Sequence, residues 1–143
     1  MFIAKNEDLI ILVKETREEL EQALQFMIYT SIEETEVEYE LYNGEYLTKD
    51  EIAQRERERL NLLSLTKREV FLAIYKDKGI TPEQIRAMIP NEEGKIEFDY
   101  ANDYFRGNPL INKIGEQLGY TEEQLDYLFE YGEFENELAT NVL

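Results

Sequence analysis

The stretch that decides the fold is residues 65–89, LTKREVFLAIYKDKGITPEQIRAMI. Thr66, followed three residues later by Glu69, is the capping-box pattern that begins a helix. The apolar side chains after it recur at helical spacing: Val70, Phe71, Ile74 and Tyr75. Gly79 is a typical helix end, and Thr81-Pro82 begins another helix, because proline is well tolerated at a first helical position. The stretch therefore predicts two consecutive helices joined by a short turn.

The same pattern recurs 40 residues later. Residues 79–85, GITPEQI, match residues 119–125, GYTEEQL, and a helical stripe precedes each glycine. Both a duplicated recruitment unit and convergence of two helix corners on the same residues would produce this likeness, and we favour convergence. Beyond the first copy we expect a loop over residues 90–94. Helices then follow over three ranges: Ile96–Phe105, Pro109–Leu118 and Thr121–Tyr131.

Strands are predicted on the N-terminal side. Residues 1–13 read as two extended segments broken near Asn6, and a helix begins at Thr16 with a stripe that continues through Met27 and Ile28. Over residues 35–47, glutamates alternate with apolar residues as in a half-buried strand, and Asn43-Gly44 indicates a tight hairpin turn. A further capping box at Thr48 begins a helix that reaches about Leu63.

These elements predict an α+β fold that is mainly α. It combines an N-terminal β-hairpin or small antiparallel sheet with a bundle of about six helices. The 143 residues, 43% of them hydrophobic, suffice for one domain with a real core. We expect a single domain, 1–143, with a strand, helix and hairpin part at 1–47, a helical part at 48–131 and a frayed tail at 132–143.

Charge is the most unusual property of the sequence. It carries 32 acidic and 15 basic residues, a formal net charge of −17. Residues 15–45 hold ten acidic residues against one basic residue, and residues 91–143 hold thirteen against three. Such a molecule is repelled by nucleic acid and by anionic membranes and attracted to basic protein surfaces. Acidity that serves solubility alone is the other interpretation.

The residue inventory argues against catalysis. Histidine and cysteine are absent, which removes the commonest general base and any cysteine metal site. The two serines, Ser31 and Ser64, lie in no nucleophile-elbow pattern. Asp99, Asn102 and Asp103 lie close together, but their spacing is not that of a calcium loop. We expect no enzymatic activity, no cofactor and no bound metal.

Direct binding to nucleic acid or to a membrane is not expected either. The helix that begins after Thr121 carries three acids and no base over residues 122–126, where a recognition helix would meet phosphates. The longest apolar run near the N-terminus, Leu9–Val13, is too short for a signal peptide or a membrane span. We expect a soluble protein of the cytoplasm.

Two acidic sets are the candidate partner-binding residues. Glu36, Glu38 and Glu40 would lie on one face of a strand at about 6.8 Å intervals, close to the phosphate spacing of a nucleic-acid strand. The second set lies in the acidic C-terminal third: Glu122, Glu123, Asp126 and Glu130. Together they could imitate a polyanion and occupy the basic groove of another protein. The plainer interpretation is a solvated outer face that also deters strand aggregation.

Residues 65–89 and 104–129 resemble segments of small proteins encoded by bacteriophages and prophages, including tail and tail-accessory proteins. In size and charge the chain is also similar to acidic phage inhibitors of host defence, such as anti-CRISPR and anti-restriction proteins that mimic nucleic acid. The resemblance implies a mobile-element origin. It does not choose between an inhibitor of a host nucleic-acid-binding protein, such as a CRISPR nuclease, and a tail or assembly protein. The net charge, the glutamate row and the lack of catalytic residues favour the inhibitor, and the tail or assembly role is the alternative. The second role would use exposed members of one aromatic set: Tyr100, Tyr104, Phe105 and Tyr120. The interpretation that we favour for these rings is that they fill the core.

Overall fold

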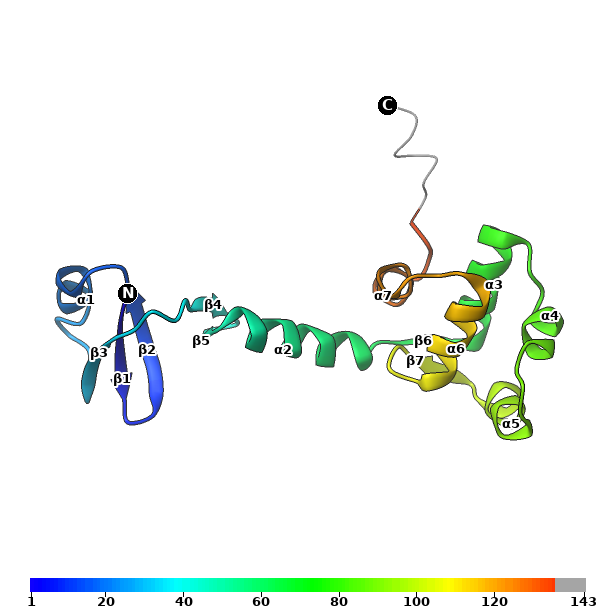
Figure 1. Ribbon diagram of the computed structural model, residues 1–143, viewed down its shortest axis with the longest axis horizontal. Coiled ribbons are helices and arrows are strands. Elements are labelled where there is room, and N and C mark those ends of the chain that lie inside the picture. The colour runs from blue at the N-terminus through cyan, green and yellow to red at the C-terminus, as the bar shows by residue number, and fades with distance from the viewer. Residues whose placement is uncertain (136–143) are drawn as a thin grey trace, which may run out of the picture. The chain divides into compact units, whose positions relative to one another are not determined.

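The computed structural model describes residues 1–135 and divides the chain into two compact units, Met1–Glu56 and Arg57–Leu143 (Figure 1). The boundary falls inside one helix, α2 (Lys49–Asn61). Seven helices and seven short strands are present among the described residues. The predicted α+β, mainly α fold class is confirmed. The single domain that we expect for residues 1–143 stays a prediction.

Unit 1 (Met1–Glu56) is built on a three-stranded antiparallel sheet. Its strands are β1 (Phe2–Asn6), β2 (Leu9–Lys14) and β3 (Ser31–Glu34), in the order β2-β1-β3. The two predicted N-terminal segments are thus confirmed, with a turn at Glu7 of positive φ (58°). Helix α1 (Arg17–Ala23) packs on the sheet through one small core: Ala4, Leu20 and Leu24, with Phe2, Ile11, Leu12 and Ile32 around them.

The first helix is shorter than its apolar stripe predicts. It ends at Ala23, and the side chains of Met27 and Ile28 are 44% and 83% exposed. The backbone N–H of Thr30 donates to the carbonyl of Lys5 at 2.7 Å, where β3 begins to pair with β1. The chain therefore leaves the helix early because the third strand has to reach the sheet.

The strand predicted from Thr35 is largely wrong, although its hairpin turn is correct. Strands β4 (Glu40–Tyr42) and β5 (Glu45–Leu47) pair around Asn43-Gly44, whose φ angles are 47° and 85°. Residues 35–39 form no strand, and the N–H of Val37 donates to the hydroxyl of Thr35 at 3.1 Å. This local hydrogen bond competes with the hydrogen bonds that the backbone would make to a neighbouring strand. Val37 is also 47% exposed and belongs to neither hydrophobic core, so the expected apolar face of the strand is not buried.

Up to Glu135, the last residue described, unit 2 (Arg57–Leu143) contains five helices after α2 and one strand pair. The helices are α3 (Lys67–Lys78), α4 (Pro82–Ala87), α5 (Glu92–Tyr100), α6 (Pro109–Leu118) and α7 (Glu122–Tyr131). Strand β6 (Ser64–Thr66) pairs antiparallel with β7 (Asp103–Phe105). This pair was not predicted. Its three-residue strands have no periodicity to recognise, and the partners lie far apart in sequence.

The helices of unit 2 enclose the larger core. Its most buried side chains include Ile85, Tyr104 and Leu128, with exposures of 1% or less. Gly115 of α6 lets α7 approach closely, since a Cβ atom there would lie 2.6 Å from Cδ1 of Leu125. Arg106 is the one buried charged residue among those described. Unit 2 is therefore a helical core with a single internal guanidinium.

The two predicted helix corners have the same local structure. Gly79 ends α3 and Gly119 ends α6, with φ angles of 68° and 79°. Thr81 and Thr121 then begin α4 and α7 with a capping box to a glutamine three residues on. The sequence match between the copies is therefore a match of helix stop and helix start.

Two boundaries in the C-terminal half differ from expectation. Helix α5 begins at Glu92 inside the predicted loop, because the side chain of Asn91 accepts from the N–H of Gly94 at 2.6 Å and caps it. The helix ends at Tyr100, and Phe105 belongs to β7. At the predicted frayed tail, Phe134 stacks on Tyr120 with ring centroids 4.2 Å apart. Residues 136–143 of that tail lie outside the described residues.

Candidate binding surfaces

One end of the sheet in unit 1 forms an acidic recess of about 700 Å³. We define the acidic recess by its lining residues: Met1, Glu15, Glu34, Thr35, Glu36 and Glu38. The sheet register explains why these segments meet. Phe2 of β1 lies opposite Lys14 on one side and Glu34 on the other. Glu15 and the residues after β3 are thereby brought to the same end of the sheet.

The four glutamates of the acidic recess form no ion pair within the described part of the chain. All four glutamates are exposed, and among residues 1–135 none of them has an ion pair. Glu33, their neighbour, differs because it lies 3.0 Å from the ammonium group of Lys5. Four unpaired carboxylates around one recess favour a cationic ligand, and guanidinium and ammonium groups are the cations that protein surfaces supply.

The first predicted acidic set is only partly brought together. Glu36 and Glu38 line the acidic recess, whereas Glu40 lies in β4 opposite Leu47. The expected linear row on one strand is wrong, because residues 35–39 form no strand. Sequence reasoning missed Glu15 and Glu34. The alternation that selected Glu36 could have been extended to Glu34, but Glu15 arrives through pairing that no local pattern reveals.

The second predicted set is divided between free and paired carboxylates. Glu122 and Glu123 are exposed and have no ion pair among the described residues. Asp126 instead accepts from the guanidinium of Arg57 at 2.7 Å and from that of Arg106 at 2.8 Å. Glu130 pairs with Arg59 at 3.0 Å. Half of this set therefore neutralises arginines of the same unit.

Asp126 has an altered protonation equilibrium. Burial alone would raise the pKa of its carboxyl group, but hydrogen bonds from Arg57 and Arg106 outweigh burial and lower that pKa below the ordinary value. Arg106 also donates to the side chain of Asn112 at 2.7 Å. The buried guanidinium group of Arg106 thus has hydrogen-bond partners in Asp126 and Asn112, and the carboxylate of Asp126 is used within unit 2.

The aromatic set separates into core and surface. Tyr104 and Tyr120 are buried, and their hydroxyl groups donate to the carbonyl of Phe98 at 3.1 Å and to Asp77 at 2.7 Å. Burial raises the pKa of Tyr104 to about 12. Tyr100 and Phe105 are 80% and 54% exposed, so only these two could contact a partner.

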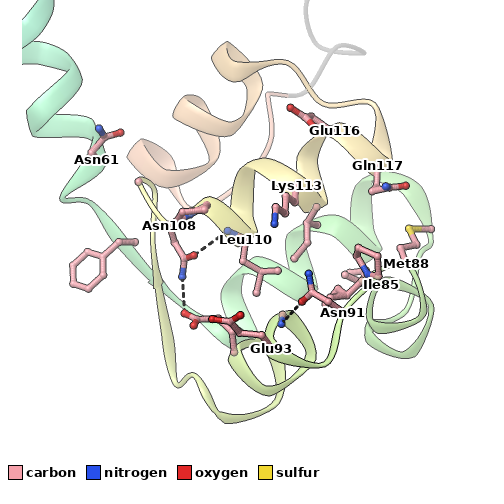
Figure 2. A pocket seen from close by; sticks show the side chains of 18 residues that line it. Asn61, Ile85, Met88, Asn91, Glu93, Asn108, Leu110, Lys113, Glu116 and Gln117 are labelled. Carbon is pink, nitrogen blue, oxygen red and sulfur yellow. Dashed lines mark hydrogen bonds between the residues drawn. The ribbon is translucent and has the colours of Figure 1, made fainter.

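A second hollow lies within unit 2, between α4, α5 and one face of α6. This α6 pocket has a volume of about 780 Å³ (Figure 2). Its polar edge includes Glu93, Glu97, Lys113 and Glu116. Its apolar part comprises Ile85, Met88, Ile89, Pro90, Phe105, Pro109, Leu110 and Ile114. It therefore combines an apolar floor with a charged edge, as ligand sites commonly do.

The carboxylate of Asp99, which lies close to Asn102 and Asp103 in the sequence, is bound by an arginine. Asp99 accepts from Arg86 at 2.9 Å and 3.0 Å, and hydrogen bonding to Arg86 lowers the pKa of that carboxyl. Across residues 1–135, no three aspartates or glutamates are grouped so that they could hold a metal ion. Over the same residues, no helix has the length and apolar character needed to cross a bilayer.

Comparison with known proteins gives no match, since no family model fits the sequence and no curated protein or solved structure is significantly similar to it.

Proposed function

We propose that the protein is a non-enzymatic, phage-encoded inhibitor that binds a host nucleic-acid-binding defence protein, such as a CRISPR nuclease. Binding would take place in the cytoplasm of the host bacterium. The acidic recess would dock on the basic groove that otherwise holds nucleic acid. The observation that supports this proposal is the group of four exposed, unpaired carboxylates at one end of the sheet.

Charge complementarity explains why such a surface would select this class of partner. Unit 1 carries 15 acidic and 5 basic residues, so its field attracts a positively charged groove and speeds association. Arginine and lysine side chains of the groove would donate to Glu34, Glu36 and Glu38 as they do to phosphates. Nucleic acid and the inhibitor would then compete for the same cations. No chemical step is needed, so inhibition would be stoichiometric.

Charge reversal in the acidic recess tests the proposal. The variant Glu34→Lys/Glu36→Lys/Glu38→Lys should lose its partner, whereas Asp103→Lys/Glu133→Lys/Glu135→Lys should not. The control changes the net charge equally at exposed positions of unit 2. Reversal at Arg55 or Arg59 is a poorer control, because it would break ion pairs with Glu45 and Glu130.

The measurement is affinity capture from a bacterial lysate, with mass spectrometry of the bound proteins. A nuclease captured by the parent chain would then be assayed for DNA cleavage with and without each variant. We expect capture and inhibition by the parent and the control and neither by the recess variant. Equal capture by all three chains would contradict the proposal.

The second candidate function is a phage tail or assembly role, favoured by the exposure of Tyr100 and Phe105. Aromatic side chains with this exposure are common anchors of protein interfaces. Here Tyr100→Ser/Phe105→Ser would lose a captured tail component, while the recess variant would retain it. The same capture experiment therefore separates the two functions.

A further inference from the structure

The α6 pocket has the form of a groove along one helix. Leu110, Lys113, Ile114 and Gln117 line it and recur at the spacing that places residues on one face of a helix. The opposite wall comes from α4, the Pro90 turn and α5. A helix of ten residues, such as α6, is about 15 Å long. At about 5.4 Å per turn, the groove can therefore accommodate nearly three turns of a ligand helix.

The floor of the groove is apolar and already packed. Ile85, Leu110 and Ile114 are 0%, 6% and 6% exposed. At its edges Met88 and Phe105 remain 38% and 54% exposed. A ligand with apolar side chains would cover these two residues and gain the free energy of removing their surface from water. The flexible thioether of Met88 can also adjust to the shape of the ligand.

The edge of the groove carries net negative charge, and each wall contributes at least one carboxylate. Glu93 and Glu97 lie on α5 and Glu116 on α6, against the single cation Lys113. Glu93 and Glu116 lie on opposite sides of the pocket (Figure 2). A ligand seated on the floor would thus meet carboxylates along both of its flanks.

One of these carboxylates is held in place before any ligand binds. The amide nitrogen of Asn108 donates to Glu97 at 3.1 Å, while its oxygen accepts from the N–H of Leu110 at 2.9 Å and caps α6 (Figure 2). Neither bond neutralises Glu97. Fixing the Glu97 side chain in advance reduces the conformational entropy that this side chain would lose on binding a ligand.

From these features we propose that the α6 pocket binds a cationic amphipathic helix of a partner protein. Apolar side chains spaced three and four residues apart would lie on the floor, and flanking lysine or arginine side chains would pair with Glu93, Glu97 and Glu116. This is the helix-in-groove mode of recognition. The site lies wholly in unit 2, so the proposal stands independently of the acidic recess.

The test uses a synthetic helical peptide of about 14 residues made of leucine and lysine, with leucine at the core positions of two heptads. Its affinity for the full chain would be measured by fluorescence anisotropy. Its position would be mapped from chemical-shift changes of the ¹⁵N-labelled protein. Mapping is essential, because a chain of net charge −17 attracts any cationic peptide. We expect the largest shifts at α6 and around Met88 and Glu93.

Two variants test the two parts of the site. Glu93→Gln/Glu97→Gln/Glu116→Gln removes three charges, keeps the acceptor for Asn108 and should weaken binding about tenfold. Met88→Ser/Phe105→Ser removes the exposed apolar edge and should have an effect of similar size. All five residues are exposed, and thermal unfolding would verify that both variants fold.

The control variant Asp103→Asn/Glu133→Gln/Glu135→Gln removes three charges outside the pocket and should bind as the parent does. The recess variant should leave the pocket shifts unchanged. Three results would each overturn the proposal. They are equal weakening by the control, equal affinity for a peptide with glutamate in place of lysine, and shifts confined to unit 1.

Discussion

Arg57 and Asp126 are joined by two hydrogen bonds, at 3.0 Å and 2.7 Å, although 69 residues separate them in the sequence. The same carboxylate also accepts from Nε of Arg106, whose side chain is 3% exposed. One acidic residue of α7 thus pairs with two guanidinium groups and connects the last turns of α2 to the core of unit 2.

Replacement of Asp126 by asparagine should destabilise unit 2 by about 2–3 kcal/mol. The substitution leaves the buried guanidinium of Arg106 without a counter-charge, and breaking a buried pair is costly. Partial exposure of Asp126 reduces the cost below that of a fully buried pair. Urea unfolding would measure the change. Glu123→Gln, on the same helix but exposed and without an ion pair among residues 1–135, should change stability by less than about 0.5 kcal/mol.

The contribution of Asp126 should disappear in acid. Its pKa is lower in the folded chain than in the unfolded chain, so the stabilisation is complete above the unfolded value of about 3.9. It is lost as the pH falls through the lowered folded value. The difference in stability between the parent and Asp126→Asn should therefore be constant from about pH 7 to pH 5 and shrink below about pH 4. A gap that persists at low pH would show that the charge is not its cause.

Replacement of Gly115 by alanine should destabilise the chain by about 1 kcal/mol. The new methyl group would meet Cδ1 of Leu125 at 2.6 Å, and Leu125 is buried. Overpacking of this kind costs about 1–3 kcal/mol, which exceeds the gain of about 1 kcal/mol from replacing a helical glycine. Leu125→Val removes the opposing atoms. Leu125→Val should therefore reduce the free energy of unfolding less in the Gly115→Ala chain than in the parent. Additive losses of stability would contradict the steric explanation.

Replacement of Phe134 by alanine should lower stability by about 1 kcal/mol. Its ring stacks on Tyr120 with an interplanar angle of 5°, and such pairs contribute about 0.5–1.5 kcal/mol beyond their burial. Thermal unfolding would report the loss. Truncation after Glu133 or after Glu135 offers a comparison, in which only the first removes the ring. Equal stability of these two chains would mean that Phe134 makes no contribution.

Partner binding through the acidic recess should weaken with salt. Exposed charges are screened within about 8 Å at physiological ionic strength, so the affinity of a captured partner should fall steadily as sodium chloride is raised. A single charge reversal in the recess, Glu36→Lys, should give both weaker binding of the partner and a shallower dependence of the affinity on salt. An affinity that is the same at low and high salt would exclude electrostatic mimicry.

Local signals account for most of what could be predicted. The turn at Asn43-Gly44 and the start of α3 at Thr66 depend on residues within a few positions of one another. Helix α6 begins at Pro109 and ends at Leu118, the predicted range, because an N-terminal proline and a C-terminal glycine define its two ends.

The features that were missed depend on distant residues. Pairing of Leu65 with Tyr104 leaves no trace in either segment, since three residues are too few for a period. The acidic recess needs Glu15 and Glu34 on either side of β1, and only the strand register brings them together. From the sequence, Asp126 looks like one more exposed acidic residue, because nothing near it in the chain shows that Arg57 and Arg106 pair with it in the fold.

The pairing of β6 with β7 also bears on the order in which the chain can fold during synthesis. Three helices, α3, α4 and α5, lie between these strands, so the strand pair closes a long loop. The ammonium group of Lys67 adds to this closure by donating to the carbonyls of Phe98 and Asp99. Closing such a loop is slow, because chain entropy is lost before the contacts form. Unit 1 contains both partners of all its strand pairs within its first 47 residues. We therefore expect unit 1 to fold as it leaves the ribosome, while unit 2 waits until the strand at Asp103–Phe105 has been made.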